Sequence, residues 1–150
     1  MIPQLRVSGL DEIRRKFAQW PDKFSGVIHT TVWASLQQMW SAVGRRGYPP
    51  KPPNSTYVRT MTLGRSIGVS GSPDIYEARE LGQGNWKGSI GTRLEYAPYV
   101  IGSRATQQAH QNKHWWTLPE DIVNDSKDKI LRLFQIAAEE LVDWLNRNNG

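Results

Sequence analysis

The chain has 150 residues and carries nineteen Lys and Arg against fourteen Asp and Glu, with no cysteine. A chain of this length is most simply one domain, because hydrophobic cores split into separate domains only at larger sizes. Without cysteine, disulfide frameworks and thiolate chemistry are excluded. No window approaches the ~20 apolar residues of a membrane span, and the first residues lack the apolar run of a signal peptide. We therefore expect a soluble protein with no membrane partner.

The net charge is +5 and the isoelectric point is about 9.7, so the chain is only moderately basic. Its positive charges are dispersed along the sequence. The nearest approach to a cluster comprises Arg45, Arg46, Lys51, Arg59 and Arg65. A solvated loop and a phosphate-binding surface are both compatible with such a cluster.

The first fifty residues predict a short strand and two helices. Residues 5–7 alternate as a strand does, and the capping oxygens of residues 8–11 precede apolar residues at helical spacing as far as Trp20. Pro21 suits the first turn of a second, longer helix, where its missing N–H has no cost. Gly44 and Gly47 end that helix around two arginines.

The second helix carries an apolar stripe at intervals of three or four residues over about five turns. Its members are Phe24, Ile28, Val32, Leu36, Met39 and Val43. Trp33 and Trp40, seven residues apart, lie on an adjacent flank and widen the apolar face. So wide a face predicts that this helix contacts more than one layer of the fold.

Residues 48–56 carry four prolines in nine positions. Proline fixes φ and biases the preceding residue toward extended backbone, so the region from about residue 47 to about residue 58 is predicted to be an extended loop or semi-rigid arm. A ligand for an SH3-type domain is the other interpretation. We favour a loop within a single domain of residues 1–150.

The middle third predicts an antiparallel sheet of hairpins. Residues 65–70 and 75–81 are interpreted as strands around a turn at 71–74. A second turn at 82–85 leads to a further strand at 86–92. Glycines inside the first and third of these strands indicate bulges or the close approach of a neighbour.

A terminal helix follows a polar passage. Pro119 and the two acidic residues after it are favoured in a first helical turn. The apolar stripe of this helix comprises Ile130, Phe134, Ala137, Leu141 and Trp144, and its solvated face comprises Arg132, Gln135, Glu139 and Asp143. The order of elements predicts an α+β fold, in which an antiparallel sheet of hairpins packs against a long helix of the N-terminal half and a C-terminal helix.

The sequence gives little support to catalytic or metal-binding patterns. His110 and His114 have the spacing of one helix face, but no glutamate of an HExxH pattern lies between them. His29, among apolar neighbours, is interpreted as a core-edge or interface residue. The paired carboxylates are explained by helix starts and a solvated turn, and the glycine runs lack phosphate-binding spacing. We expect no enzymatic activity, no cofactor and no metal.

The seven tryptophans are either core residues or anchors of an interface, a role that tryptophan and tyrosine often take. The candidate interface residues are Trp33, Trp40, Tyr48, Tyr57, Arg59, Arg65, Trp115 and Trp116. A core position stays an open alternative for each tryptophan. Stacking on single-stranded bases is a further alternative for aromatic side chains beside arginines.

Several of these segments together resemble the siphovirus neck and tail-completion family, the small proteins that join the head and tail of a phage. The resemblance covers a Gly-Leu-acid entry into a helix at 9–12, the long amphipathic helix and a proline-containing loop. It continues with a Thr-x-x-Leu-x-x-Ser-Ile segment at 60–67 and with Tyr-Ala-Pro-Tyr-Val at 96–100. The chain departs from the family pattern at Met61, where a glycine is usual, and at residues 101–103.

This resemblance implies an α+β protomer that assembles into a homo-oligomeric ring, with hexamers the usual tail symmetry. It implies contacts with head-closure or connector proteins and with tail tube or terminator proteins, and passive contact with genome DNA. The expected location is the virion tail or neck, after synthesis in the host cytoplasm. No cofactor is implied.

Two other functions compete with a virion structural role. The first is a basic nucleic-acid-binding module that uses the arginine cluster and exposed aromatics, with an affinity that falls steeply with salt. The second is a small hydrolase or toxin, which the lack of a convincing catalytic constellation disfavours.

Overall fold

The computed structural model describes Gln4–Arg6, 21–50, 53, 54, 56, 58, 60–82, 84–102, 117 and 119–148. Its elements are β1 (Gln4–Arg6), α2 (Pro21–Ala42), η1 (Val43–Gly47), α3 (Thr62–Ser66), β2 (Ile75–Gly82), β3 (Asn85–Gly91), η2 (Pro98–Gly102) and α4 (Pro119–Asn148). The prediction of an α+β fold is confirmed. The helix predicted before Pro21 lies outside the described residues, and so do positions 51, 52, 55 and 57 of the proline-rich segment.

The three strands form an antiparallel sheet in the order β1-β3-β2. β2 and β3 form the predicted hairpin, with Tyr76 opposite Ile90 and Ala78 opposite Gly88. Gly82 and Gly84 have φ values of 97° and 75° in the connecting turn, a left-handed backbone that glycine adopts without steric cost. β1 pairs with the other edge of β3.

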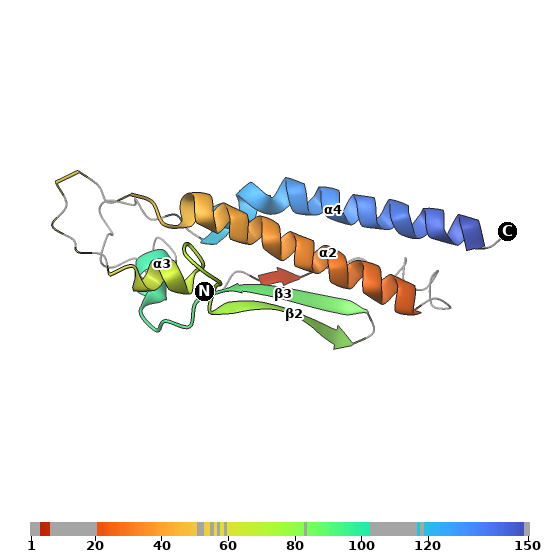
Figure 1. The fold of residues 1–150 in the computed structure, drawn as a ribbon, viewed down its shortest axis with the longest axis horizontal. Helices are drawn as coiled ribbons and strands as arrows, with labels where there is room; N and C mark the ends of the chain where they lie inside the picture. The colour runs from red at the N-terminus through yellow and green to blue at the C-terminus, as the bar shows by residue number, and fades with distance from the viewer. Residues whose placement is uncertain are drawn as a thin grey trace.

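The molecule is built in three layers, with α2 between the sheet and α4 (Figure 1). α2 and α4 run antiparallel. Lys23 Nζ lies 2.9 Å from Glu140 Oε1 at one end of the pair, and Arg46 is ion-paired with Asp125 at the other. The prediction that the long helix contacts more than one layer is confirmed.

The main core lies where α2 meets both neighbours. All six residues of the predicted α2 stripe are buried, together with Ile130, Ala137 and Leu141 of α4. β3 approaches α2 most closely at Gly88, where a Cβ atom would lie 3.1 Å from the Leu36 side chain. The predicted close approach at a strand glycine is therefore confirmed at this position.

A second core cluster closes the other end of the molecule, where α2 ends. It comprises Ala42, Val43, Leu63, Ile67, Ala97, Val100 and Ile122. The segment at 96–100 contributes two of these side chains, while Tyr96 and Tyr99 are 44% and 51% exposed. The segment thus packs against the end of the long helix through Ala97 and Val100.

The strand predicted at 65–70 is wrong, because α3 continues to Ser66 and residues 67–70 form a turn. Leu63 and Ile67, four residues apart, are both buried on one helical face. Gly68 then turns the chain with φ of 91°, and the backbone N–H of Asp74 donates to Ser66 O. The alternating pattern of residues 65–70 predicts a strand. A helical turn forms instead because it buries Leu63 and Ile67, four residues apart, together in the second core.

Among the described residues, no helix combines the length and the apolar content that crossing a bilayer requires.

Candidate interaction surface

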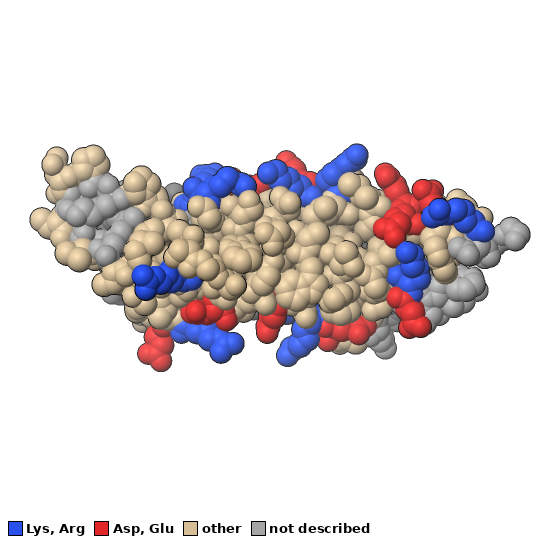
Figure 2. Space-filling view, in the orientation of Figure 1, with Lys and Arg blue, Asp and Glu red and all other residues tan. Residues whose placement is uncertain are grey.

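The exposed face of α2 carries no charged side chain over most of its length. Residues 24–44 contain no Asp, Glu, Lys or Arg, and the exposed positions among them are Gly26, His29, Thr30, Gln37, Ser41 and Gly44. Charged side chains line the two long edges of this face, over α4 and β2, while its middle is free of them (Figure 2). At 1.5 Å per residue the uncharged stretch is about 30 Å long.

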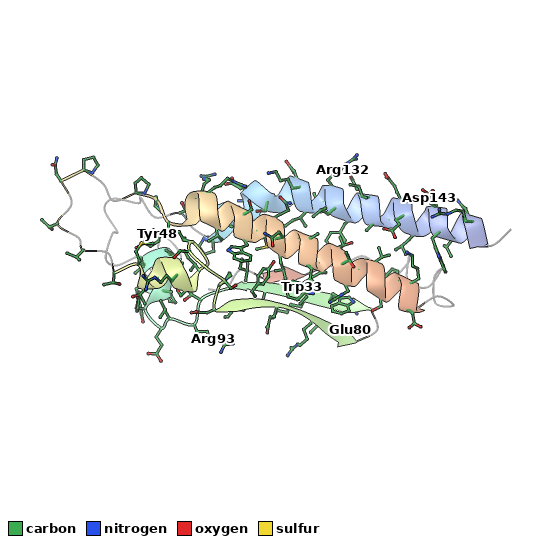
Figure 3. All side chains as sticks on the ribbon, in the orientation of Figure 1. Trp33, Tyr48, Glu80, Arg93, Arg132 and Asp143 are labelled. Carbon is green, nitrogen blue, oxygen red and sulfur yellow. The ribbon has the colours of Figure 1, made fainter. Side chains whose placement is uncertain are left out.

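The predicted interface residues Trp33 and Trp40 lie between α2 and the sheet. Their ring centroids are 5.2 Å and 5.1 Å from that of Tyr76 on β2, in edge-to-face geometry. Both indoles are half-buried, and Trp33 points from α2 toward the sheet (Figure 3). Much of their apolar surface is therefore covered within the protomer.

The indole N–H groups of these residues are also satisfied internally. Trp40 Nε1 donates to Gly68 O at 2.7 Å, and Trp33 Nε1 donates to His29 Nε2 at 2.9 Å. Gly68 is required for this contact, because a Cβ atom there would lie 2.6 Å from Trp40 Nε1. Only the outer rims of Trp33 and Trp40 remain to contact a partner.

The aromatic cluster continues to Trp86 on β3. The His29 ring lies 4.9 Å from Trp86, which places this histidine at the edge of the core. Trp86 Nε1 is buried and has no hydrogen-bond partner among the described residues. Burial raises the pKa of Tyr76, whose hydroxyl donates to Gln37 Oε1 at 3.1 Å.

The other candidate residues lie elsewhere. Tyr48 packs against the second core, with its ring over Gly64 of α3, and Arg65 is exposed on the same short helix. The structure therefore brings Tyr48 and Arg65 to α3, apart from the Trp33 and Trp40 pair. Tyr57, Arg59, Trp115 and Trp116 lie outside the described residues.

The arginine cluster is partly used by the fold. Arg46 is ion-paired with Asp125 of α4, and its carbonyl accepts a hydrogen bond from the Thr117 hydroxyl. Arg45 is exposed and donates to Ser41 Oγ at 2.6 Å. Lys51, the remaining loop cation of the cluster, lies outside the described residues along with Arg59.

A groove of about 510 Å³ lies between α2 and α4, a feature the sequence reasoning missed. Its walls include Gly26, Val27, Thr30 and Ala34 of α2 and Leu133 and Ile136 of α4. Gly26, Thr30 and Ala34 recur every four residues and share one helix face. This run of small residues is visible in the local sequence. The position of α4, which forms the opposite wall of the groove, is not.

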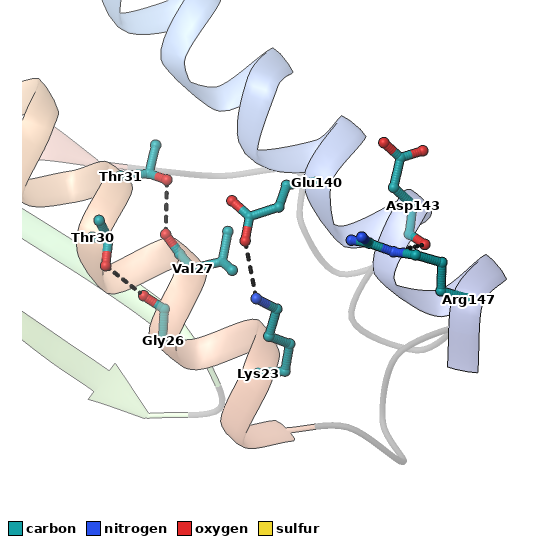
Figure 4. A network of polar contacts seen from close by, with 8 residues as sticks. All are labelled: Lys23, Gly26, Val27, Thr30, Thr31, Glu140, Asp143 and Arg147. Carbon is teal, nitrogen blue, oxygen red and sulfur yellow. Dashed lines mark hydrogen bonds and ion pairs between the residues drawn. The ribbon is translucent and has the colours of Figure 1, made fainter. Parts of the chain in front are cut away.

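Four polar side chains around the groove, those of Lys23, Thr30, Thr31 and Glu140, are already bonded within the protomer. The Thr30 hydroxyl donates to Gly26 O at 3.0 Å, and the Thr31 hydroxyl donates to Val27 O at 2.7 Å. Lys23 and Glu140 pair with each other across one end (Figure 4). An apolar surface can therefore cover the groove without leaving these donors unsatisfied.

No group of three or more metal-ligating side chains occurs in the part of the chain that the structure describes; His110 and His114 lie outside that part. Comparison of the chain with models of known protein families, with curated proteins and with solved structures finds no match.

Proposed function

We propose that this chain is a structural protein of a phage head–tail junction, where copies form a ring that joins the tail to the head without catalysis. The uncharged face of α2 is the observation that carries the proposal. The resemblance at 60–67 and 96–100 to the neck and tail-completion family supplies the biological setting.

The uncharged face supports assembly for an electrostatic reason. Copies with a net charge of +5 repel one another, and like charges brought together in a contact cost free energy. A contact made over residues 24–44 places no cation or anion of α2 in the interface. Interface cores are depleted in charged residues, as this face is.

The proposed partners are other copies of the chain, a head-closure or connector protein, and a tail tube or terminator protein. A ring requires a heterologous contact between two different patches of each protomer. The segment at 96–100, with exposed Tyr96 and Tyr99, provides a further surface beside the C-terminal end of α2. Genome DNA passing through the ring needs no dedicated site.

Deletion of the gene from the phage genome or prophage that carries it tests this proposal. We expect electron micrographs of the lysate to show separate heads and tails, and addition of the purified protein to restore joined particles. Heat-denatured protein is the control. Normal joined particles from the deletion strain would overturn the proposal.

A further inference from the structure

We infer that the groove between α2 and α4 binds α4 of a second copy, along a ridge formed by Leu131, Gln135, Ala138 and Val142. This inference rests on the proposed function, since it names the contact through which copies form the ring. The name α4 ridge is used below for these four residues.

The α4 ridge is an uncharged strip, with two large apolar side chains that the fold leaves exposed. Leu131 and Val142 are 52% and 50% exposed, and the ridge residues follow the four- and three-residue steps of one helix face. None of the four is charged. The rest of the described surface of α4 is rich in acidic and basic side chains (Figure 2). Because this strip is uncharged, it is better suited to burial in a contact than the rest of the helix.

The groove and the ridge lie on opposite flanks of α4. At about 100° per residue, Leu131 and Val142 are about 120–140° around the helix from Ile136, which lines the groove. One protomer therefore presents both surfaces at once. The groove of each copy can bind the ridge of one neighbour, while its own ridge binds the groove of another neighbour. This is a heterologous contact, which closes into a ring when the rotation fits.

The groove floor allows a helix to come close. Gly26, Thr30 and Ala34 have small side chains at four-residue spacing, and a Cβ atom at Gly26 would meet nothing within 4 Å. Helix axes approach to about 8–10 Å depending on the side chains at the contact. The Thr30 hydroxyl is bonded within α2, so the floor presents methyl groups and backbone to the ridge.

Charge sets the direction of the bound helix. Asp22 lies four residues before Gly26 at one end of the groove, and Lys127 lies four residues before Leu131 at one end of the ridge. Both are exposed, and neither takes part in an ion pair within the described part of the chain. Pairing Lys127 with Asp22 aligns the two helices in parallel and sets Leu131 over Gly26 and Gln135 beside Thr30.

Disulfide cross-linking tests this register directly, because the natural chain has no cysteine. The variant Thr30→Cys/Gln135→Cys is expected to form, under mild oxidation, a ladder of covalent oligomers on a non-reducing gel. A disulfide requires Cα atoms about 4.4–6.8 Å apart, so the reaction reports close contact. Thr30→Cys/Glu77→Cys, with Glu77 on the exposed outer surface of β2, is the matched control and should stay monomeric on the gel.

The single-cysteine variants exclude other arrangements. Covalent dimers from Thr30→Cys alone mean that two grooves meet, and dimers from Gln135→Cys alone mean that two ridges meet. Either result overturns the inference. The reaction is run with free protein and with protein bound to heads or tails, so that assembly on a docking site is also sampled.

A charge substitution gives an independent measurement. Thr30→Arg is expected to weaken self-association at least about tenfold, because it places an unpaired charge against the α4 ridge of the bound copy. Ser72→Arg, at an exposed position between α3 and β2 that lies outside both the groove lining and the α2 face, is expected to leave association within about twofold. Equal effects of the two variants overturn the inference.

The outcome can be separated from that of the proposed function. If the wild-type protein restores head–tail joining but the double-cysteine variant forms no ladder in those particles, this contact is wrong and the junction role stands. If the wild-type protein fails to restore joining, the junction role is wrong. If it also remains monomeric under every condition, both are overturned.

Discussion

Trp40 and Trp86 lie in one aromatic cluster but differ in the hydrogen bonding of the indole N–H. The Trp40 group donates to Gly68 O at 2.7 Å, whereas that of Trp86 is buried with no acceptor in the part of the chain that the structure describes. A buried donor left unsatisfied costs about 1–3 kcal/mol, while a made hydrogen bond stabilises by about 1 kcal/mol. The same substitution at the two positions should therefore have unequal effects.

We predict that Trp40→Phe lowers the free energy of unfolding by about 1–3 kcal/mol, because Gly68 O loses its donor and apolar area is lost. Trp86→Phe should change it by less than about 1 kcal/mol, since loss of ring area is offset by removal of the unsatisfied donor. Urea denaturation of both variants measures the difference. A larger loss for Trp86→Phe contradicts the hydrogen-bond assignment.

Tyr76 gives the fold a dependence on alkaline pH. Burial raises its pKa above the value of about 10 in the unfolded chain. Below about pH 10 both states are neutral, and its contribution to stability is fully present. Above that pH the unfolded state loses the proton first, so stability falls as the pH rises toward the folded pKa.

We predict that the wild-type protein loses stability relative to Tyr76→Phe as the pH rises above about 10. Lysines that titrate in this range are common to both proteins and cancel in the comparison. Urea unfolding at neutral pH and at the alkaline end provides the measurement. Parallel pH profiles for the two proteins would contradict the role of Tyr76.

At the scale of elements, α2 is held by two unlike contacts. Its stripe packs on α4 through aliphatic and aromatic side chains, and two members of the stripe, Val32 and Leu36, also lie against Gly88 of β3. The second contact leaves little space, since added atoms there meet Leu36 at 3.1 Å and Val32 at 3.2 Å. The distance between helix and sheet is therefore sensitive to a single methyl group.

We predict that Gly88→Ala lowers the free energy of unfolding by about 1–3 kcal/mol, as overpacking of a core does. Gly44→Ala is the matched control, because its Cβ meets nothing within 4 Å. That change should be neutral or stabilise by about 0.4–1 kcal/mol through loss of backbone freedom in the unfolded state. Thermal unfolding of both variants measures the two changes in stability. If Gly88→Ala does not lower the stability, α2 and β3 are further apart than this contact requires.

For the whole molecule, the distribution of charge separates the two leading functions. Assembly through the α2 face and the α4 ridge uses surfaces that are mainly uncharged, with a single proposed ion pair, Lys127 with Asp22, at the end of the contact. Nucleic-acid binding would use the exposed Arg45 and Arg65, while Arg46 is tied to Asp125. Salt screens the second kind of contact far more than the first.

We predict that self-association changes little between about 50 and about 200 mM salt, a range over which phosphate contacts weaken steeply. Light scattering over a concentration series at each salt level measures association, and a gel shift with DNA serves as the parallel assay. Association that collapses with added salt, together with a strong gel shift at low salt, would favour the nucleic-acid-binding module.

The sequence alone determined the elements whose pattern is local. The stripe from Phe24 to Val43 specified α2, the stripe from Ile130 to Trp144 specified α4, and glycines marked the turn between β2 and β3. Hydrophobic periodicity records which side of an element is buried, so these elements were predictable. The local alternation at 65–70 gave a wrong prediction. Leu63 and Ile67 are buried together because they pack against residues of the second core that are distant in the sequence.

Only the tertiary structure decided which surfaces remain free. Trp33 and Trp40 were candidates for an interface, yet Tyr76 and Gly68, distant in sequence, cover much of both. The groove exists because α4 lies beside Gly26, Thr30 and Ala34, more than ninety residues earlier in the chain. Local periodicity shows that a side chain is apolar and on one face, whereas the neighbour that covers it depends on how distant elements pack.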